Sequence, residues 1–103
     1  MEKDSQNLGA NIELSGFRDI DSSSMVVVRK IIANHLRRIG ELSRKMEKLH
    51  ITLKPVHERE KSEKYEVHAK LLNNGKVFVS EITNRNLFVA VDSVLQKLTN
   101  ELD

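Results

Sequence analysis

The chain has 103 residues and a mass of 11.8 kDa, which is the size of one domain with one hydrophobic core. It contains no cysteine, so disulfide bonds, thiolate catalysis and cysteine-ligated zinc are excluded for this sequence. No apolar run approaches the roughly 20 residues that span a bilayer. We therefore expect a soluble protein of the cytoplasm that makes no contact with a membrane.

Positive charge is concentrated in the middle of the sequence. The formal net charge is +2 at pH 7, but the stretch 29–76 holds thirteen Lys and Arg residues against six Glu. The two flanking stretches together hold four basic and nine acidic residues. A basic block of this kind is typical of nucleic-acid binding, although many such blocks are only solvated surface. Charge alone leaves both interpretations open.

The N-terminal part of the chain predicts a flexible start and then a short strand. Residues 1–10 are polar and without periodicity, so we expect a flexible N-terminus before a single domain at 11–103. The stretch 11–17 alternates apolar and polar residues, which predicts a strand that ends at Gly16. The acidic turn and the serines that follow, up to Ser24, offer N-caps for a helix.

A basic amphipathic helix is predicted from Met25 to about Lys48. Its apolar residues recur at helical spacing: Met25, Val28, Ile31, Ile32, Leu36, Ile39, Leu42 and Met46. The opposite side carries a basic ridge of Lys30, Arg37, Arg44 and Lys48, with Arg29, Arg38 and Lys45 beside it. Only Glu41 and Glu47 offset this charge, so the ridge fits phosphate groups better than an ordinary solvated helix does.

The second half of the chain predicts three strands and a second helix. The stretch 49–54 alternates and ends at Pro55, and 56–64 is a charged loop. The strands 65–71 and 76–82 are joined by a hairpin turn at Asn74 and Gly75. The second helix is capped within 83–86, and its apolar face consists of Phe88, Ala90, Val91, Val94, Leu95, Leu98 and Leu102.

This order of elements predicts an α+β fold of two layers. The connectivity is βαβββα, with both helices packed on one face of a mostly antiparallel four-stranded sheet. The other face of the sheet is expected to be exposed or lightly covered.

The sequence offers no recognisable catalytic, metal or cofactor site. It has no phosphate-binding glycine motif, no GxxG loop of a KH module and too few strand aromatics for an RRM. His35 falls near the middle of the apolar stripe of the first helix, so we expect it to be a core or core-edge residue, and we expect His57 in the charged loop. His50 and His68 could approach each other on a sheet surface, but no third ligand is evident. An enzyme is therefore the least favoured class of protein.

Several stretches together resemble the ribosome hibernation-promoting factor family, the short ribosome-associated translation inhibitors. The resemblance covers about residues 11–102. It is carried by a His-containing alternating strand, by a hairpin turn and by the start of the second helix, which read Leu49-His50-Ile51-Thr52-Leu53, Asn74-Gly75, and Asn86-Leu87-Phe88-Val89-Ala90-Val91-Asp92 with Lys97-Leu98.

The resemblance implies a fold similar to a double-stranded-RNA-binding domain with an added first strand. It also implies binding to rRNA of the small ribosomal subunit near the decoding centre, through basic residues of both helices. Carried over to this chain, the RNA-binding residues are Lys30, Arg37, Arg38, Arg44, Lys45, Lys48, Arg85 and Lys97. The sequence departs from the family's basic helix end, because Asn100, Glu101, Leu102 and Asp103 stand there.

Our leading hypothesis is a monomeric, non-enzymatic protein that blocks mRNA and tRNA on idle ribosomes, as in stress-induced ribosome hibernation. A first alternative is a general double-stranded or structured RNA-binding module without ribosome preference. A second alternative is a protein-interaction adaptor that uses the acidic second helix and the exposed sheet face. Steep salt dependence of binding would favour either RNA hypothesis over the adaptor.

Overall fold

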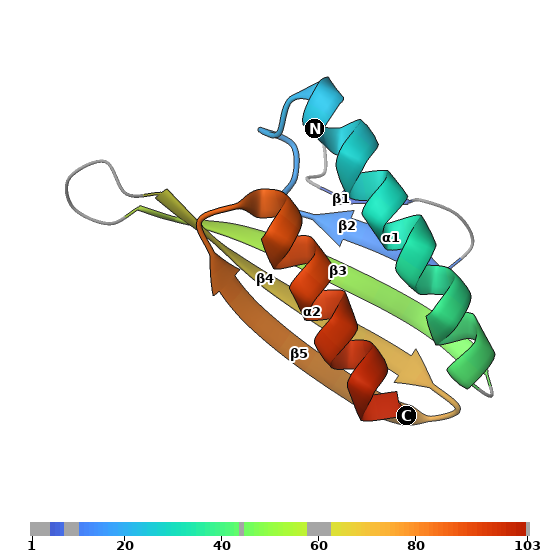
Figure 1. The fold of residues 1–103 in the computed structure, drawn as a ribbon. Coiled ribbons are helices and arrows are strands. Elements are labelled where there is room, and N and C mark those ends of the chain that lie inside the picture. Colours follow the sequence, from blue (N-terminus) through green and yellow to red (C-terminus); the bar gives the residue numbers. More distant parts are fainter. Residues whose placement is uncertain (1–4, 8–10, 44, 58–62, 103) are drawn as a thin grey trace.

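Two helices pack on one face of a single sheet in the computed structural model (Figure 1), which describes residues 5–7, 11–43, 45–57 and 63–102. The elements are β1 (Ser5–Asn7), β2 (Ile12–Ser15), α1 (Ser22–Leu42), β3 (Met46–His57), β4 (Glu63–Asn73), β5 (Lys76–Asn84) and α2 (Leu87–Leu102). Neither helix of the described residues is long and apolar enough to cross a membrane.

The sheet follows chain order from β1 to β5. β2 and β3 are parallel, with α1 as the crossover between them, and all other neighbours are antiparallel. The predicted βαβββα arrangement is confirmed by β2, α1, β3, β4, β5 and α2. β1 is an additional edge strand in which Ser5 pairs with Ser15 and Asn7 with Glu13. It falls within the stretch expected to be flexible, whose other residues lie outside the described ones.

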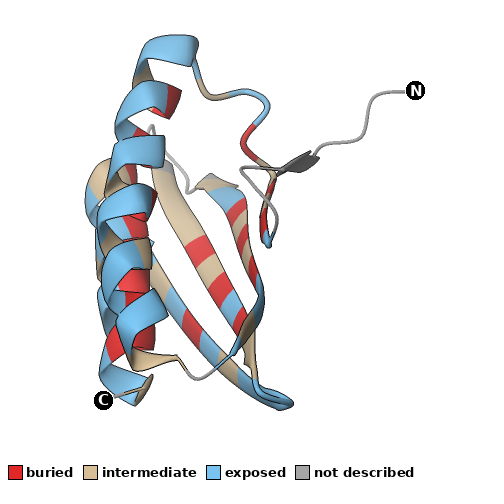
Figure 2. Cartoon of the chain, turned by 90° about the vertical axis from the view of Figure 1, so that its right-hand side faces the viewer, coloured by how far each residue is buried: buried red, intermediate tan, exposed pale blue. Residues whose placement is uncertain are grey.

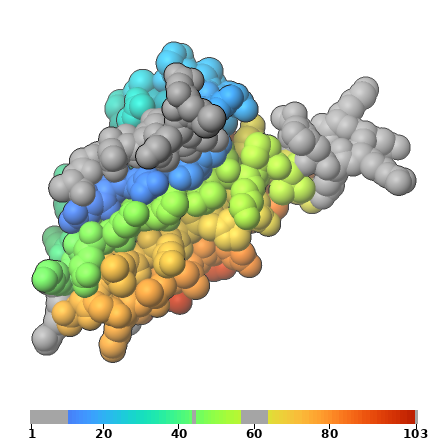
Figure 3. Space-filling view, turned by 180° about the vertical axis from the view of Figure 1, so that it is seen from behind, coloured from blue at the N-terminus to red at the C-terminus, as the bar shows by residue number. Residues whose placement is uncertain are grey.

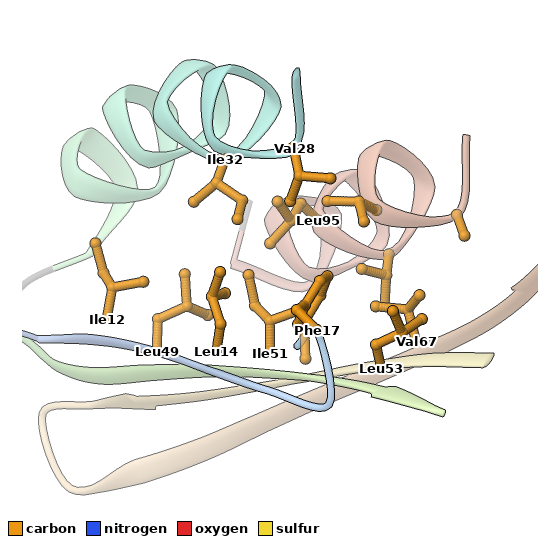
Figure 4. Packing of buried hydrophobic residues seen from close by; sticks show 14 of the residues in the cluster. Ile12, Leu14, Phe17, Val28, Ile32, Leu49, Ile51, Leu53, Val67 and Leu95 are labelled. Carbon is orange, nitrogen blue, oxygen red and sulfur yellow. The ribbon is translucent and has the colours of Figure 1, made fainter. Parts of the chain in front are cut away.

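Strand register gathers the apolar side chains on the helix side of the sheet. Leu49, Ile51 and Leu53 of β3 lie opposite Leu71, Ala69 and Val67 of β4, and all six residues are buried. Buried positions recur at alternate residues along these strands (Figure 2). The strand side chains point towards Val28 and Ile32 of α1 and Leu95 of α2 (Figure 4). This alternation leaves the opposite sheet face without a helix over it (Figure 3).

Helix α1 ends at Leu42, several residues before the predicted end near Lys48. Ser43 has an extended backbone, and its N–H donates to the carbonyl of Ile39 at 2.8 Å. From Met46 the chain pairs with β4 instead of continuing the helix. The four-residue spacing from Leu42 to Met46 fits a continued helix as well as the start of a strand. Pairing with β4 makes it the start of a strand.

The central hairpin is longer than predicted. β3 does not end at Pro55 but continues to His57, and β4 already begins at Glu63. β2 pairs with β3 only as far as Thr52, so no strand lies beside Pro55 on that side. The N–H that proline lacks is therefore not needed for a hydrogen bond there. The predicted loop 56–64 is therefore shorter at both ends, and residues 58–62 lie outside the described ones.

Turns and caps fix where the elements begin and end. Asn74 and Gly75 have positive φ angles of 52° and 79°, which confirms the predicted hairpin turn. Gly16 has a φ of 84°, and a Cβ there would overlap the carbonyl of Leu53. Asp21 accepts from the Ser24 N–H at 3.1 Å and caps α1, and Asn86 caps α2 in the same way. Asn86 accepts from two N–H groups, at 2.9 and 3.1 Å.

Candidate nucleic-acid interface

The outer face of α1 carries two basic residues without a described counter-charge. Lys30 and Arg37 are exposed and lie two helical turns apart, about 10 Å along the helix axis. Within the described residues neither of them forms an ion pair. Two such cations on one helix face can approach phosphates of a nucleic-acid backbone without first breaking internal contacts.

Further cations flank this pair on the same helix. Arg38 lies 3.7 Å from Glu41, and both side chains are more than half exposed, so the ion pair is weak. Arg29 is also exposed on α1. We call Lys30, Arg37 and Arg38 the α1 cation face.

Lys45 lies at the C-terminal end of this face, in the connection to β3. Its N–H donates to Asn73 Oδ1 at 3.0 Å, and its carbonyl accepts from the N–H of Asn74 at 2.9 Å. These bonds hold its backbone against the β4–β5 turn while its side chain stays exposed. Arg44, the other basic residue predicted here, lies outside the described residues.

Lys48 does not belong to the α1 cation face, which corrects the predicted ridge. Because the helix ends at Leu42, Lys48 lies on β3, with its side chain on the open face of the sheet. Its Nζ is 3.0 Å from a carboxylate oxygen of Glu13 on the neighbouring strand β2.

The two basic residues predicted from the second helix lie in different places. Arg85 is exposed just before α2 and lines a shallow cavity of about 310 Å³ together with Asp21, Ser24 and Tyr65. This places Arg85 near the start of α1. Lys97 lies on the side of α2 that faces β5, where its Nζ donates to the carbonyl oxygen of Glu81 at 2.9 Å. The structure therefore brings Arg85, but not Lys97, close to α1.

The two helices are joined by a direct polar contact. His35 Nε2 lies 2.7 Å from Asp92 Oδ1. The His35 side chain is 13% exposed, so of the two predicted places, core or core edge, it occupies the core edge. Asp92 itself is 62% exposed, and beyond it α2 presents Gln96 and Asn100, which bond to each other. The helix layer is thus basic along α1 and neutral to acidic along α2.

Several titratable groups on the open sheet face lie close to carboxylates. His50 Nε2 lies 2.7 Å from Ser15 Oγ and 3.9 Å from Glu13. His68 contacts Glu66 at 2.9 Å and Glu81 at 3.4 Å. The hydrogen bond from His68, aided by its charge and that of Lys54, holds the pKa of Glu66 below its ordinary value. This face carries carboxylates next to Lys48, His50 and His68, whereas Lys30 and Arg37 on α1 have no described counter-charge.

The histidines do not form a metal site within the described part of the chain. No group of three or more His, Asp or Glu side chains suited to a metal ion is found there. The nearby carboxylates instead pair with His50 and His68 individually.

Comparisons with known proteins identify the fold through solved structures. Neither protein-family models nor curated proteins match the chain in sequence. A ribosomal subunit interface protein from Coxiella burnetii superposes with a TM-score of 0.59 at 16% identity, covering 89% of this chain and 90% of that one. The N-terminal domain of Thermus thermophilus Protein Y gives a TM-score of 0.53 at 17% identity, covering 89% and 91%.

Both of these structures belong to the hibernation-promoting factor family, to which the sequence motifs point as well. At these identities the likeness establishes architecture. The chain therefore has the α+β fold of the hibernation-promoting factor family along nearly its whole length.

Proposed function

We propose that this protein is a non-enzymatic, cytoplasmic ribosome-associated factor that binds rRNA of the small subunit near the decoding region. The α1 cation face, with Lys45 and Arg85 at its two ends, would contact phosphates. The domain would then exclude mRNA and tRNA by occupying their path. A fold shared with a ribosomal subunit interface protein supports this partner.

One observation carries the proposal: Lys30 and Arg37 project from α1 without a described counter-charge, whereas Lys48 on the open sheet face lies 3.0 Å from a carboxylate oxygen of Glu13. Free cations release counterions when they meet phosphates, but paired ones must first give up their partner. The His35–Asp92 contact and the shared core fix α1 against α2. Specificity would come from the shape of this rigid layer, because the α1 cation face has no aromatic residue to stack on bases.

Co-sedimentation with purified ribosomal subunits across a salt series tests the proposal. We expect stoichiometric binding to the small subunit that weakens steeply between about 50 and 200 mM salt, because several phosphate contacts are involved. Binding to the large subunit, or no binding near physiological salt, would contradict it.

A second candidate function is general binding of structured RNA. The α1 cation face has no aromatic residue that would stack on bases, so its contacts would be with phosphates. Phosphates are common to every RNA, which favours this second function. Competition between small subunits and a generic RNA duplex distinguishes the two. If the duplex displaces the protein at equal phosphate concentration, the ribosome preference is wrong and the general module is right.

A further inference from the structure

The outer edge of β5 has backbone groups that pair with no other strand of the described sheet. β5 pairs only with β4, and Asn73 and Lys76 are the pair that closes the two-residue turn. Pairs in an antiparallel ladder alternate, so the N–H and C=O groups of Val77, Val79 and Glu81 point away from β4. The bond from Lys97 to the Glu81 carbonyl agrees with this alternation.

Lys97 protects only part of this edge. It occupies the carbonyl of Glu81 in the middle of the strand. Closer to the turn, no described residue bonds to the outward groups of Val77 and Val79. An exposed edge of this kind pairs readily with a further extended segment, which natural proteins usually prevent with charge, proline or a covering element.

The side chains along the same stretch are apolar and exposed. Val77 and Val79 are 55% and 59% exposed, on the open face of the sheet along which β5 forms the rim (Figure 3). Leu72 lies opposite Val77, and Lys70 opposite Val79. Lys48, His50, Lys70, Leu72 and Val77 line a shallow cavity of about 240 Å³ there.

The two sides of this edge differ in chemistry. On the open face the edge offers Val77 and Val79, followed by Glu81, which lies 3.4 Å from His68. On the helix side it offers Lys76 at one end, because Lys76 shares its side with Phe78 and the buried Ser80. At the other end Lys97 lies near Glu81 and shares a cavity with Glu101, whereas Lys76 forms no ion pair within the described residues. Side chains of an added strand alternate between the two sides. The best complement is therefore a strand that alternates apolar with acidic residues.

We propose that β5 from Lys76 to Glu81 binds an extended segment of a partner protein, in which apolar and acidic residues alternate, as a sixth strand of the sheet. Backbone hydrogen bonds to Val77 and Val79 would hold the segment, apolar side chains would cover the valines, and carboxylates would meet Lys76 and Lys97. This surface is separate from the α1 cation face, because α1 lies over the β2–β3 side of the sheet and α2 over β4 and β5 (Figure 1). The inference does not depend on the proposed function.

Titration of the isotope-labelled full chain with a synthetic heptapeptide of alternating Glu and Val, followed by NMR, tests this proposal. We expect saturable shifts at Val77 and Val79 and at least tenfold slower hydrogen exchange of both amides. Two matched peptides serve as controls: one is N-methylated at alternate residues, and one has Lys in place of Glu. Both should bind at least tenfold more weakly, and equal binding of either would overturn the proposal.

Protein variants separate edge binding from unspecific attraction. Replacing Val77 and Val79 by Thr keeps strand propensity and should abolish saturable binding of the Glu–Val peptide. Lys76→Glu should weaken binding at least tenfold, while the matched Lys54→Glu at the far end of the open face should not.

Other occupants of this edge would overturn the proposal. A concentration-dependent dimer that protects Val77 and Val79 without peptide would assign the edge to a second copy of this chain. Equal shifts at these amides with a short RNA would assign it to nucleic acid.

Discussion

The outer face of α1 and the open face of the sheet both carry several cations, yet their electrostatic situations differ. On the sheet, Lys48 lies 3.0 Å from Glu13, and His68 lies between two carboxylates. On α1, Lys30 and Arg37 project into solvent, and Glu41 is paired with Arg38. The arrangement of counter-charges, more than the number of cations, therefore distinguishes a candidate phosphate-binding face.

Geometry explains this difference. In a sheet, neighbouring strands bring side chains from distant parts of the sequence to about 5 Å from each other, so Glu13 reaches Lys48. On an exposed helix face, the neighbouring side chains are those of residues three or four positions away. Around Lys30 these positions hold Val26, Val27, Ala33 and Asn34, none of which is acidic.

Among the substitutions considered, one at Gly16, directly after β2, should cause the largest loss of stability. Gly16→Ala would place a Cβ against the Leu53 carbonyl and force alanine into a positive φ, so we expect about 3 kcal/mol or more of destabilisation. Urea denaturation measures it. The matched Gly75→Ala has a similar φ but open space around the new Cβ, so about 1 kcal/mol is expected. Equal losses would show that the contact with Leu53 is unimportant.

Loss of the N-cap of α2 should destabilise the protein less than Gly16→Ala does. Asn86→Ala removes the acceptor for the N–H groups of Phe88 and Val89, and we expect a loss of about 1 kcal/mol. Thermal and urea unfolding measure this loss. Asn86→Asp retains the acceptor and should stay close to the parent chain. A loss as large as that of Gly16→Ala would mean that Asn86 does more than cap α2.

The paired charges of the sheet can be tested with a double-mutant cycle. Lys48→Gln, Glu13→Gln and the double variant should give a coupling energy of about 0.5 kcal/mol or less, because both groups are partly exposed. Lys48→Gln should also leave RNA binding unchanged. A marked loss of RNA binding would place Lys48 in the interface after all.

The smallest effect expected is the acid dependence of the α1 cap. Hydrogen bonds from the side chain and the backbone of Ser24 lower the pKa of Asp21. Since the folded pKa lies below the unfolded one, the stabilisation is complete at neutral pH and is lost as pH falls through the ordinary carboxyl range and below. Asp21→Asn keeps an acceptor but does not titrate, so its Tm should fall less between pH 7 and pH 3. An identical fall would contradict the cap's role.

Much of the architecture could be predicted from local pattern. Alternation in Leu49, Ile51 and Leu53, and the Asn74–Gly75 turn, have one straightforward structural meaning each. The end of α1 could not be predicted, because Met46 continues the helical spacing while pairing with Asn73 in the sheet. β1 contains no apolar residue, so no alternating pattern could predict it.

The candidate site was less predictable than the fold, because contacts between elements that are distant in sequence decide which cations have a partner. Lys97 is an ordinary helix cation in sequence, and only the approach of α2 to the β5 edge gives it the Glu81 carbonyl as a partner. Lys48 likewise changes faces once the helix ends at Leu42. Lys30 and Arg37 were predictable, because their surroundings are set within one helix.

The most direct test of the central claim compares two double charge reversals in co-sedimentation with isolated small ribosomal subunits. Lys30→Glu with Arg37→Glu changes the α1 cation face, and Lys54→Glu with Lys70→Glu changes the open sheet face by the same net charge. We predict at least a hundredfold weaker binding for the α1 variant and less than a threefold change for the sheet variant, with both chains folded by circular dichroism. Equal losses, or a greater loss for the sheet variant, would contradict the assignment of RNA binding to α1.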